Sequence, residues 1–410
     1  MRLATKRALD FHLGRPLLTS LQAAARLLGL LLRRDHSLAP VGTVLIAKFQ
    51  GLGSLVLCKP ALARLREHYP EARILFWGTP ATVTLARQMP EFDEILVLDD
   101  RTLLKAVASL PGVLLRLWRL RVDWAFDLEP YSRFSSALIT MSMARNRTGF
   151  ALEQLRSRRV HTHLIYFNRY HHLGDAYARI FGQLLPDPAV IDTGAYGAWR
   201  FPLDPLPSIP GPYFLVNIHA GDLSLERRWP RPYFEQLIAA LLDLKPGSVA
   251  VLIGHGAAEV EYVAPLAQGE RRIDLSGKLD LQETIRVIAN AELVVTNDSA
   301  PLHLALATGS RVVGLFGPTR AESYLPPGRS HAIGIHVPLY CSPCVHHWEP
   351  PPCNGDNQCM KRITVTQVLA RCCDLLGLPV PDSATLADAG AGEARSTYYP
   401  GLVYRRSARG

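Results

Sequence analysis

The segment 297–299, Asn-Asp-Ser, is the part of this sequence best suited to bind an anion. It follows an apolar run at 293–295 that predicts a buried parallel strand, and a proline stands at position 301. Asn, Asp and Ser are frequent helix N-caps and proline favours the first helical turn, so a helix is expected over 301–307, ending at Gly309. Amides at such a helix start favour a diphosphate, and His303 would lie one turn along, beside it.

A second apolar run, 312–316, ends at the tripeptide Gly-Pro-Thr and extends this pattern to strand, polar loop, helix and strand. In open α/β sheets, ligands bind where strands end and helices begin, so the loop is predicted to line a ligand crevice. A purely structural N-cap with a buried, satisfied histidine fits the same residues and remains open.

This ordered stretch resembles the donor-site signature of glycosyltransferase family 9, the bacterial lipopolysaccharide heptosyltransferase family. The resemblance implies an α/β protein with the GT-B fold, in which two Rossmann-like domains face each other across a cleft. It also implies inverting, metal-independent transfer of a sugar from a nucleotide diphosphate, usually ADP-heptose. The residues that it assigns to the diphosphate are Asn297, Asp298, Ser299, Ala300 and His303.

Two more donor-side residues come from this resemblance. The motif Arg-Arg-Trp-Pro at 227–230 is similar to the family's Lys-Arg-Trp-Pro, which makes Arg227 the expected phosphate ligand. A guanidinium suits phosphate oxygens, although a solvated basic loop is the alternative. Glu259 is the expected ribose contact, with Glu261 close by as the other choice.

The N-terminal half begins with a predicted strand at 43–47, a glycine-containing turn at 50–54, a helix at 60–68 and a strand at 73–77. This is a βαβ unit, so a parallel sheet is expected. The resemblance extends here and assigns this half to the acceptor. Family members carry an aspartate, the expected general base, at the position of Ser54, and serine has no useful basicity near neutral pH.

Glu129 is the predicted replacement base, with Ser54 positioning the acceptor hydroxyl. It ends a predicted strand at 123–129, where the family has glutamine, and a carboxylate at a strand's carboxyl end belongs in a crevice. The alternatives are an N-cap or an ion pair with Arg133. His171 and His172, near Asp175, are other candidate bases, since a neutral histidine accepts protons at pH 7.

Four cysteines with spacings of x2, x8 and x5 follow the donor stretch: Cys341, Cys344, Cys353 and Cys359. Four thiolates so spaced suit a structural zinc or an iron–sulfur cluster, and buried, unreactive thiols are the alternative. The chain has 7 cysteines in all. An odd number in a long chain without a cleavable signal indicates a reducing compartment.

The amino-acid composition and charge of the chain limit its number of domains and the kinds of partner to be expected. The 410 residues are 48% hydrophobic and 20% charged, which predicts two or three ordinary globular domains. The formal net charge of +9 favours anionic partners, but no basic run interleaved with aromatics points to nucleic acid. The apolar segment 17–32, flanked by basic residues, is too short to cross a bilayer and suits an interfacial anchor. A helix packed on the first domain is the alternative.

These observations predict a helical extension at 1–40, an acceptor domain at 41–190, a proline-rich linker at 191–212, a donor domain at 213–380 and a tail at 381–410. The expected activity is transfer of a heptose or related sugar to a lipopolysaccharide-core or other lipid-linked acceptor, at the cytoplasmic face of the inner membrane and on its anionic surface. The alternative is a non-catalytic nucleotide-sugar or glycolipid binding protein, because of Ser54.

Overall fold

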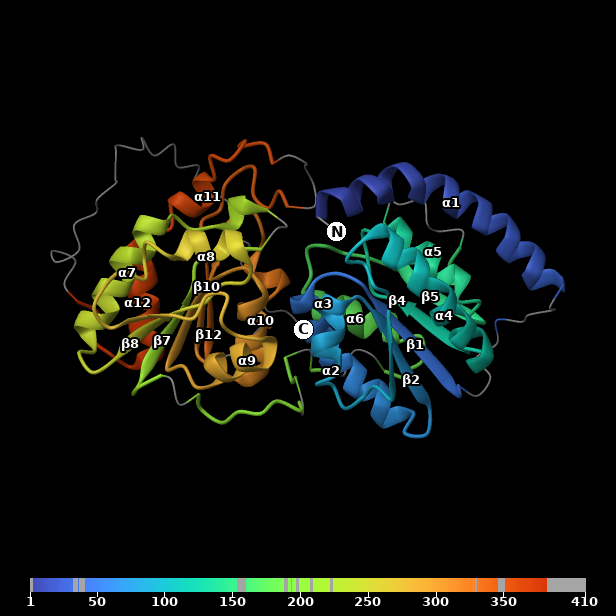
Figure 1. The fold of residues 1–410 in the computed structure, drawn as a ribbon, viewed down its shortest axis with the longest axis horizontal. Coiled ribbons are helices and arrows are strands. Elements are labelled where there is room, and N and C mark those ends of the chain that lie inside the picture. Colours follow the sequence, from blue (N-terminus) through green and yellow to red (C-terminus); the bar gives the residue numbers. More distant parts are fainter. Residues whose placement is uncertain are drawn as a thin grey trace, which may run out of the picture.

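The structure is a computed structural model. It describes residues 3–31, 36, 41–152, 160–187, 191–192, 194–196, 199–206, 209–221, 224–326, 328, 330–345 and 351–381. The predicted tail at 381–410 therefore lies almost wholly outside the described residues. Two parallel sheets, each with helices around it, lie side by side and form two lobes (Figure 1).

The N-terminal sheet has the strand order β3-β2-β1-β4-β5-β6, with every pair parallel. Alternate residues of its central strand face opposite layers, as strand geometry requires. Val44 and Ile46 pack with α2 and α6, whereas Leu45 and Ala47 pack with α4 and α5. The elements are β1 (Thr43–Lys48), α2 (Leu52–His68), β2 (Arg73–Gly78), α3 (Pro80–Ala86), β3 (Glu94–Val97), α4 (Leu103–Leu120), β4 (Trp124–Asp127), α5 (Arg133–Met141), β5 (Asn146–Ala151), β6 (His163–Tyr166) and α6 (Leu173–Phe181).

The C-terminal sheet repeats this plan with the order β12-β11-β10-β7-β8-β9. Helices α7 and α12 cover one face, and α9 and α10 cover the other. The elements are β7 (Tyr213–Asn217), α7 (Arg231–Leu244), β8 (Val249–Leu252), α8 (Ala257–Val263), β9 (Arg272–Asp274), α9 (Leu281–Ala289), β10 (Leu293–Asn297), α10 (Ala300–Thr308), β11 (Val312–Phe316), β12 (Ala332–His336), α11 (Gln358–Lys361) and α12 (Val365–Leu376).

The two lobes share one hydrophobic cluster. It runs from Phe126 in the N-terminal sheet through Leu55 on α2 to Leu302 on α10 and Val294 in the C-terminal sheet. Helices α2 and α10 form the main contact across the boundary. The residues at the starts of these two helices therefore meet between the lobes.

Helix α2 begins eight residues earlier than the sequence pattern predicted, at Leu52 and not at Pro60. Gly51 adopts a left-handed conformation, with φ of 78°, and turns the chain directly into the helix. The residues Leu55 to Leu57 are then buried, so tertiary packing extends the helix through the expected loop. Ser54 consequently lies in the first turn of a helix and not in a glycine turn.

Helix α1 (Leu3–Leu31) packs on α5 and arches over the N-terminal lobe (Figure 1). Leu18 packs with Ala137 of α5 and with Val160. Near its start, Asp10 accepts hydrogen bonds from the Phe134 amide at 2.7 Å and the Ser132 hydroxyl at 3.0 Å. Within the described part of the chain, no helix is long and apolar enough to cross a membrane.

Candidate functional site

The loop after β10 is held rigidly by its own polar side chains. Asn297 is fully buried: its Oδ1 accepts from the Trp229 amide at 3.0 Å and its Nδ2 donates to the His219 carbonyl at 3.2 Å. Asp298 is also buried, and its Oδ2 accepts from the Thr319 hydroxyl at 2.7 Å. These bonds fix the path of the backbone into α10, so its first amides have one orientation.

The start of α10 is not capped by its own side chain. Ser299 is the N-cap residue, but it makes no side-chain capping hydrogen bond. Its hydroxyl instead accepts from Asn217 Nδ2 at 2.9 Å. Ser299, Ala300 and Pro301 remain partly exposed. The amide end of this helix therefore keeps capacity for an anionic ligand.

Arg227 is buried and holds this loop through hydrogen bonds. Its Nη1 donates to the Asp298 carbonyl at 2.6 Å and lies 3.5 Å from Asp298 Oδ2. Its Nη2 donates to the Ala220 carbonyl. The guanidinium thus joins two loops of the C-terminal lobe and balances the Asp298 charge beside the helix start.

His303 lies at the contact between the lobes. A Cβ atom at Gly53 of α2 would stand only 2.1 Å from the His303 ring, so only glycine fits there. Tyr324 packs against the other side, with ring centroids 5.8 Å apart. Burial lowers the pKa of His303 to about 4, against the opposing effect of Asp298. The imidazole is therefore neutral at pH 7 and available as a hydrogen-bond partner.

The buried neutral state of His303 predicts acid destabilisation. Its folded pKa of about 4 lies below the ordinary value of 6.5, so the unfolded chain binds the proton more readily. The associated stability is complete above pH 6.5 and is lost as the pH falls towards 4, by on the order of 3 kcal/mol. Urea unfolding at pH 7.5 and pH 5 should show about 2 kcal/mol of this loss, and His303→Gln should reduce it. The exposed His255, changed to Gln, is the control; an unchanged pH dependence in His303→Gln would contradict the assignment.

On the N-terminal lobe, both carboxylate oxygens of Glu129 have partners, and Oε2 keeps room for one more. Its Oε1 accepts from the Phe49 amide at 2.8 Å and the Gln50 amide at 2.7 Å. Its Oε2 lies 2.9 Å from Lys48 Nζ. The carboxylate thus organises the loop after β1. The sequence analysis offered an ion pair between Glu129 and Arg133 as an alternative. In the structure, Arg133 lies 3.7 Å from Asp10 instead.

Ser54 and Glu129 belong to one cluster around Tyr177. The Ser54 hydroxyl donates to the Gly51 carbonyl at 2.7 Å. Burial raises the pKa of Tyr177 well above its ordinary value; the negative charge of Glu129 adds to this rise, and a hydrogen bond with Ser54 opposes it. The structure therefore brings the two predicted acceptor-side residues together.

His172 is buried, whereas its neighbour His171 is exposed. Burial lowers the pKa of His172, against the effect of Asp175, whose Oδ1 lies 4.0 Å from His172 Nδ1. The charge of His172 in turn lowers the pKa of His303. His172 and His303 thus approach each other from opposite lobes.

Glu259 lies in the first turn of α8, where its Oε2 accepts from the His255 amide at 2.7 Å. Its Oε1 lies 4.0 Å from Nδ1 of His219, which follows β7. Burial lowers the pKa of His219 to about 4. Glu259 therefore lies at the carboxyl edge of the C-terminal sheet, as the donor loop does, but the structure joins it to His219 and not to Asp298.

Three tyrosines that interact with one another or with candidate site residues were not identified from the sequence pattern. They are Tyr131, Tyr177 and Tyr324. Tyr177 is buried and Tyr324 is partly buried, and the charge of Tyr324 raises the pKa of Tyr177. Tyr131 likewise raises the pKa of Tyr324. The sequence analysis also did not identify Lys48, the partner of Glu129 at the end of β1. A lysine directly after an apolar strand could have indicated a polar site there.

The four C-terminal cysteines lie close enough together to influence one another electrostatically. Burial raises the pKa of Cys344 to about 11 and that of Cys359 to about 12, with further contributions from Cys341 and Cys353. These values hold for thiols without a metal ion, and metal binding would release their protons. Among the residues that the structure describes, no three His, Cys, Asp or Glu side chains are grouped to hold a metal ion. The expected zinc or iron–sulfur cluster at these cysteines stays a prediction.

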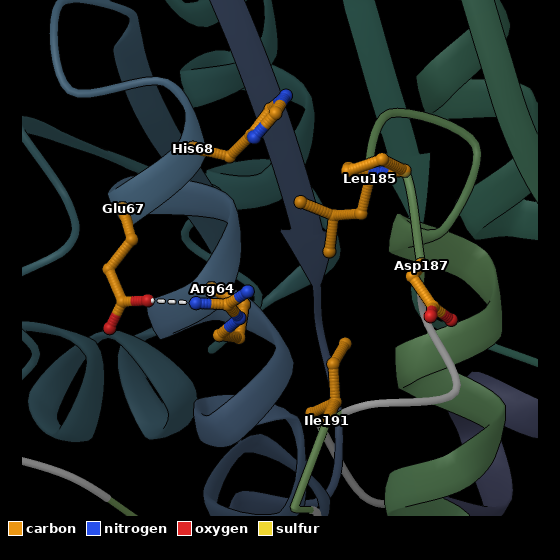
Figure 2. Close-up of a pocket in the computed structure, with 7 residues that line it drawn as sticks. Arg64, Glu67, His68, Leu185, Asp187 and Ile191 are labelled. Atoms are coloured by element: carbon orange, nitrogen blue, oxygen red, sulfur yellow. Dashed lines mark hydrogen bonds and ion pairs between the residues drawn. The ribbon is translucent and has the colours of Figure 1, made fainter.

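A separate cavity of about 220 Å³ lies away from these groups, between the end of α2 and the segment after α6 (Figure 2). Arg64 and Glu67 on its α2 wall form an exposed ion pair at 2.6 Å. Leu185 and Ile191 contribute its apolar wall. An exposed ion pair of this kind contributes little to stability. None of the residues that line the cavity is a candidate site residue. We assign no chemistry to this cavity.

Sequence comparison shows that the chain is similar to heptosyltransferases. The family model of Glycosyltransferase family 9 (heptosyltransferase) matches residues 197–353. Lipooligosaccharide heptosyltransferase 2 of Campylobacter jejuni is 24% identical over 330 residues, which are 78% of this chain and 94% of that protein.

Solved structures extend the likeness to the fold. Escherichia coli ADP-heptose lps heptosyltransferase II matches with a TM-score of 0.62 at 20% identity, over 82% of this chain and 98% of that one. E. coli heptosyltransferase WaaC with ADP-2-deoxy-2-fluoro heptose gives 0.58 at 19% identity, over 80% and 97%. The predicted arrangement of two facing Rossmann-like domains is confirmed.

Proposed function

The chain belongs to glycosyltransferase family 9 and has its GT-B fold, and from this premise we propose that it moves a heptose from ADP-heptose to a lipid-linked acceptor of the lipopolysaccharide-core type. The start of α10 carries this proposal. It presents uncapped amides beside a buried Asp298–Arg227 pair, at the contact with the other lobe. A diphosphate is the ligand class that such a helix start favours.

The donor would lie on the C-terminal lobe. Its diphosphate binds at Ser299 and Ala300, Glu259 contacts the ribose, and neutral His303 donates a hydrogen bond to a phosphate oxygen. Asn297, Asp298 and Arg227 hold the loop in place through the bonds described above. Preorganised donors of this kind stabilise the charge that develops on the departing ADP.

The reaction would invert the anomeric carbon in one displacement. The acceptor hydroxyl loses its proton to a base and attacks the anomeric carbon, while the bond from that carbon to the β-phosphate oxygen breaks and ADP leaves. Glu129 is our proposed base, with Ser54 orienting the hydroxyl. Both stand near Tyr177 in the N-terminal lobe, opposite the donor loop.

Changing Glu129 to Gln tests this role. We expect radiolabelled sugar transfer into a membrane extract to fall by about 10²- to 10⁴-fold, the usual contribution of a general base. The apparent donor KM should hardly change. Glu67→Gln, on an exposed carboxylate of the same lobe, is the matched control.

Glu129 also holds Lys48 and two loop amides, so a smaller loss of transfer would identify it as a positioning residue. In that case His172→Ala should give the larger loss, because His172 is buried and faces His303. If ADP binds but no donor tried supports transfer, the chain is a nucleotide-sugar binding protein instead.

The proposed location is peripheral, on the cytoplasmic face of the inner membrane. The described part of α1 ends at Leu31, and the basic residues that follow lie outside the described residues. The exposed leucines of α1 support the proposal, because an apolar helix with basic ends binds anionic lipid surfaces.

A further inference from the structure

Helix α4 carries an apolar stripe that no part of the described chain covers. Leu104, Val107, Leu115 and Trp118 recur at helical spacing and are 45% to 79% exposed. The core-facing side of the same helix is a different set, which includes Val113 and Leu117. An amphipathic helix normally needs only one apolar face, so the second face requires an explanation.

Helix α1 has the same property. Leu18 and Gly14 are buried, on the side that packs against α5. Leu13, Leu17, Leu28 and Leu31 follow a separate helical stripe and are 37% to 70% exposed.

The two stripes belong to the same side of the N-terminal lobe. Helices α4 and α5 cover one face of its sheet, and α1 packs on the outside of α5 (Figure 1). The Trp118 indole donates to the Met141 carbonyl at the end of α5, at 2.9 Å, and keeps its ring at the surface. Tryptophan in this setting is typical of the interface between water and lipid.

Acidic residues are scarce on the helices of this side. The sequences of α1, α4 and α5 contain a single acidic residue, Asp10, and its carboxylate is occupied by Ser132 and the Phe134 amide. Arg26, Lys105 and Arg119 are exposed on the same helices. On the opposite face of the sheet, α2 and α6 carry Glu67 and Asp175. An apolar surface with basic and no free acidic groups fits an anionic bilayer.

We propose that the stripes of α4 and α1 form one docking face for an anionic lipid bilayer, in which α4 is a second anchor besides the N-terminal helix. Leucine and tryptophan side chains enter the headgroup region, and the basic side chains contact lipid phosphates. The acceptor lobe is thereby held against the membrane that contains its substrate. The inference deepens the proposed peripheral location and does not depend on which sugar is transferred.

Flotation of the full chain with phosphatidylcholine vesicles, with and without phosphatidylglycerol, tests this face. We expect the wild type to float with the anionic vesicles only, and less at high salt. The double variant Leu104→Asp and Val107→Asp should partition at least about 10-fold less, even with α1 intact. Val380→Asp, on an exposed apolar side chain outside this lobe, should float like the wild type.

Three results would overturn the proposal: equal flotation of the α4 double variant, equal binding to neutral vesicles, or a gain in mass without vesicles, which would show that a second copy covers the stripe. ADP titration of each variant establishes that it is folded. A chain that transfers sugar but does not float refutes the docking face alone. One that floats but neither binds ADP nor transfers sugar refutes the proposed function alone.

Discussion

Replacing Gly53 with alanine is expected to reduce sugar transfer by about 100-fold while ADP binding stays nearly unchanged. The added methyl carbon would stand 2.1 Å from the His303 ring, closer than any real contact. The starts of α2 and α10 would have to separate, which moves the acceptor-side groups away from the donor. The donor loop itself is built within the C-terminal lobe and should still bind nucleotide.

Transfer into a membrane extract, together with calorimetric titration of ADP, measures the two effects separately. Gly247→Ala is the matched control, because a Cβ at Gly247 meets no atom within 4 Å. Wild-type transfer by Gly53→Ala would mean that this lobe contact has no part in catalysis. Loss of ADP binding in this variant would mean that α2 and the donor loop are not independent.

Asp298→Ala is expected to be the most destabilising single change in the donor loop. Arg227 would remain buried with its carboxylate partner gone, and the Thr319 hydroxyl would lose its acceptor. Removing one member of a buried pair costs about 3 to 5 kcal/mol, so the midpoint of urea unfolding should fall clearly. ADP affinity should fall as well, because the backbone before α10 is no longer fixed.

Asp298→Asn keeps an oxygen that can accept the hydrogen bond of Thr319. Its midpoint of urea unfolding should lie between those of the wild type and Asp298→Ala. Asp374→Ala removes an exposed ion pair with Arg371, at 2.6 Å, and should cost about 1 kcal/mol or less. If Asp298→Ala were as mild as this control, the Asp298–Arg227 pair would not organise the donor loop.

The elements that carry the proposed donor site could be predicted from the sequence because their signals are local. The apolar run, the cap residues and the glycine stop predicted the strand and helix that the structure has at Leu293–Asn297 and Ala300–Thr308. Each signal acts over a few residues, so no distant contact was needed to interpret it. The two parallel sheets followed from the same kind of repeated local pattern.

The acceptor half depends on distant contacts, and there the sequence was less informative. The early start of α2 depends on burial of Leu55 between the lobes, which no local rule contains. Glu129 was expected to face an acceptor, yet its carboxylate also binds Lys48 and the Phe49 amide across the sheet edge. Tyr324 joins the cluster from the other lobe, so its place could not be anticipated.

A structure of the chain with ADP tests the central claim most directly. We expect the β-phosphate within hydrogen-bond distance of the backbone amides at Ser299 and Ala300, with the His303 ring beside it and the N-terminal lobe across from it. An ADP molecule bound elsewhere, or a start of α10 that stays without a phosphate at saturating ADP, would contradict the account.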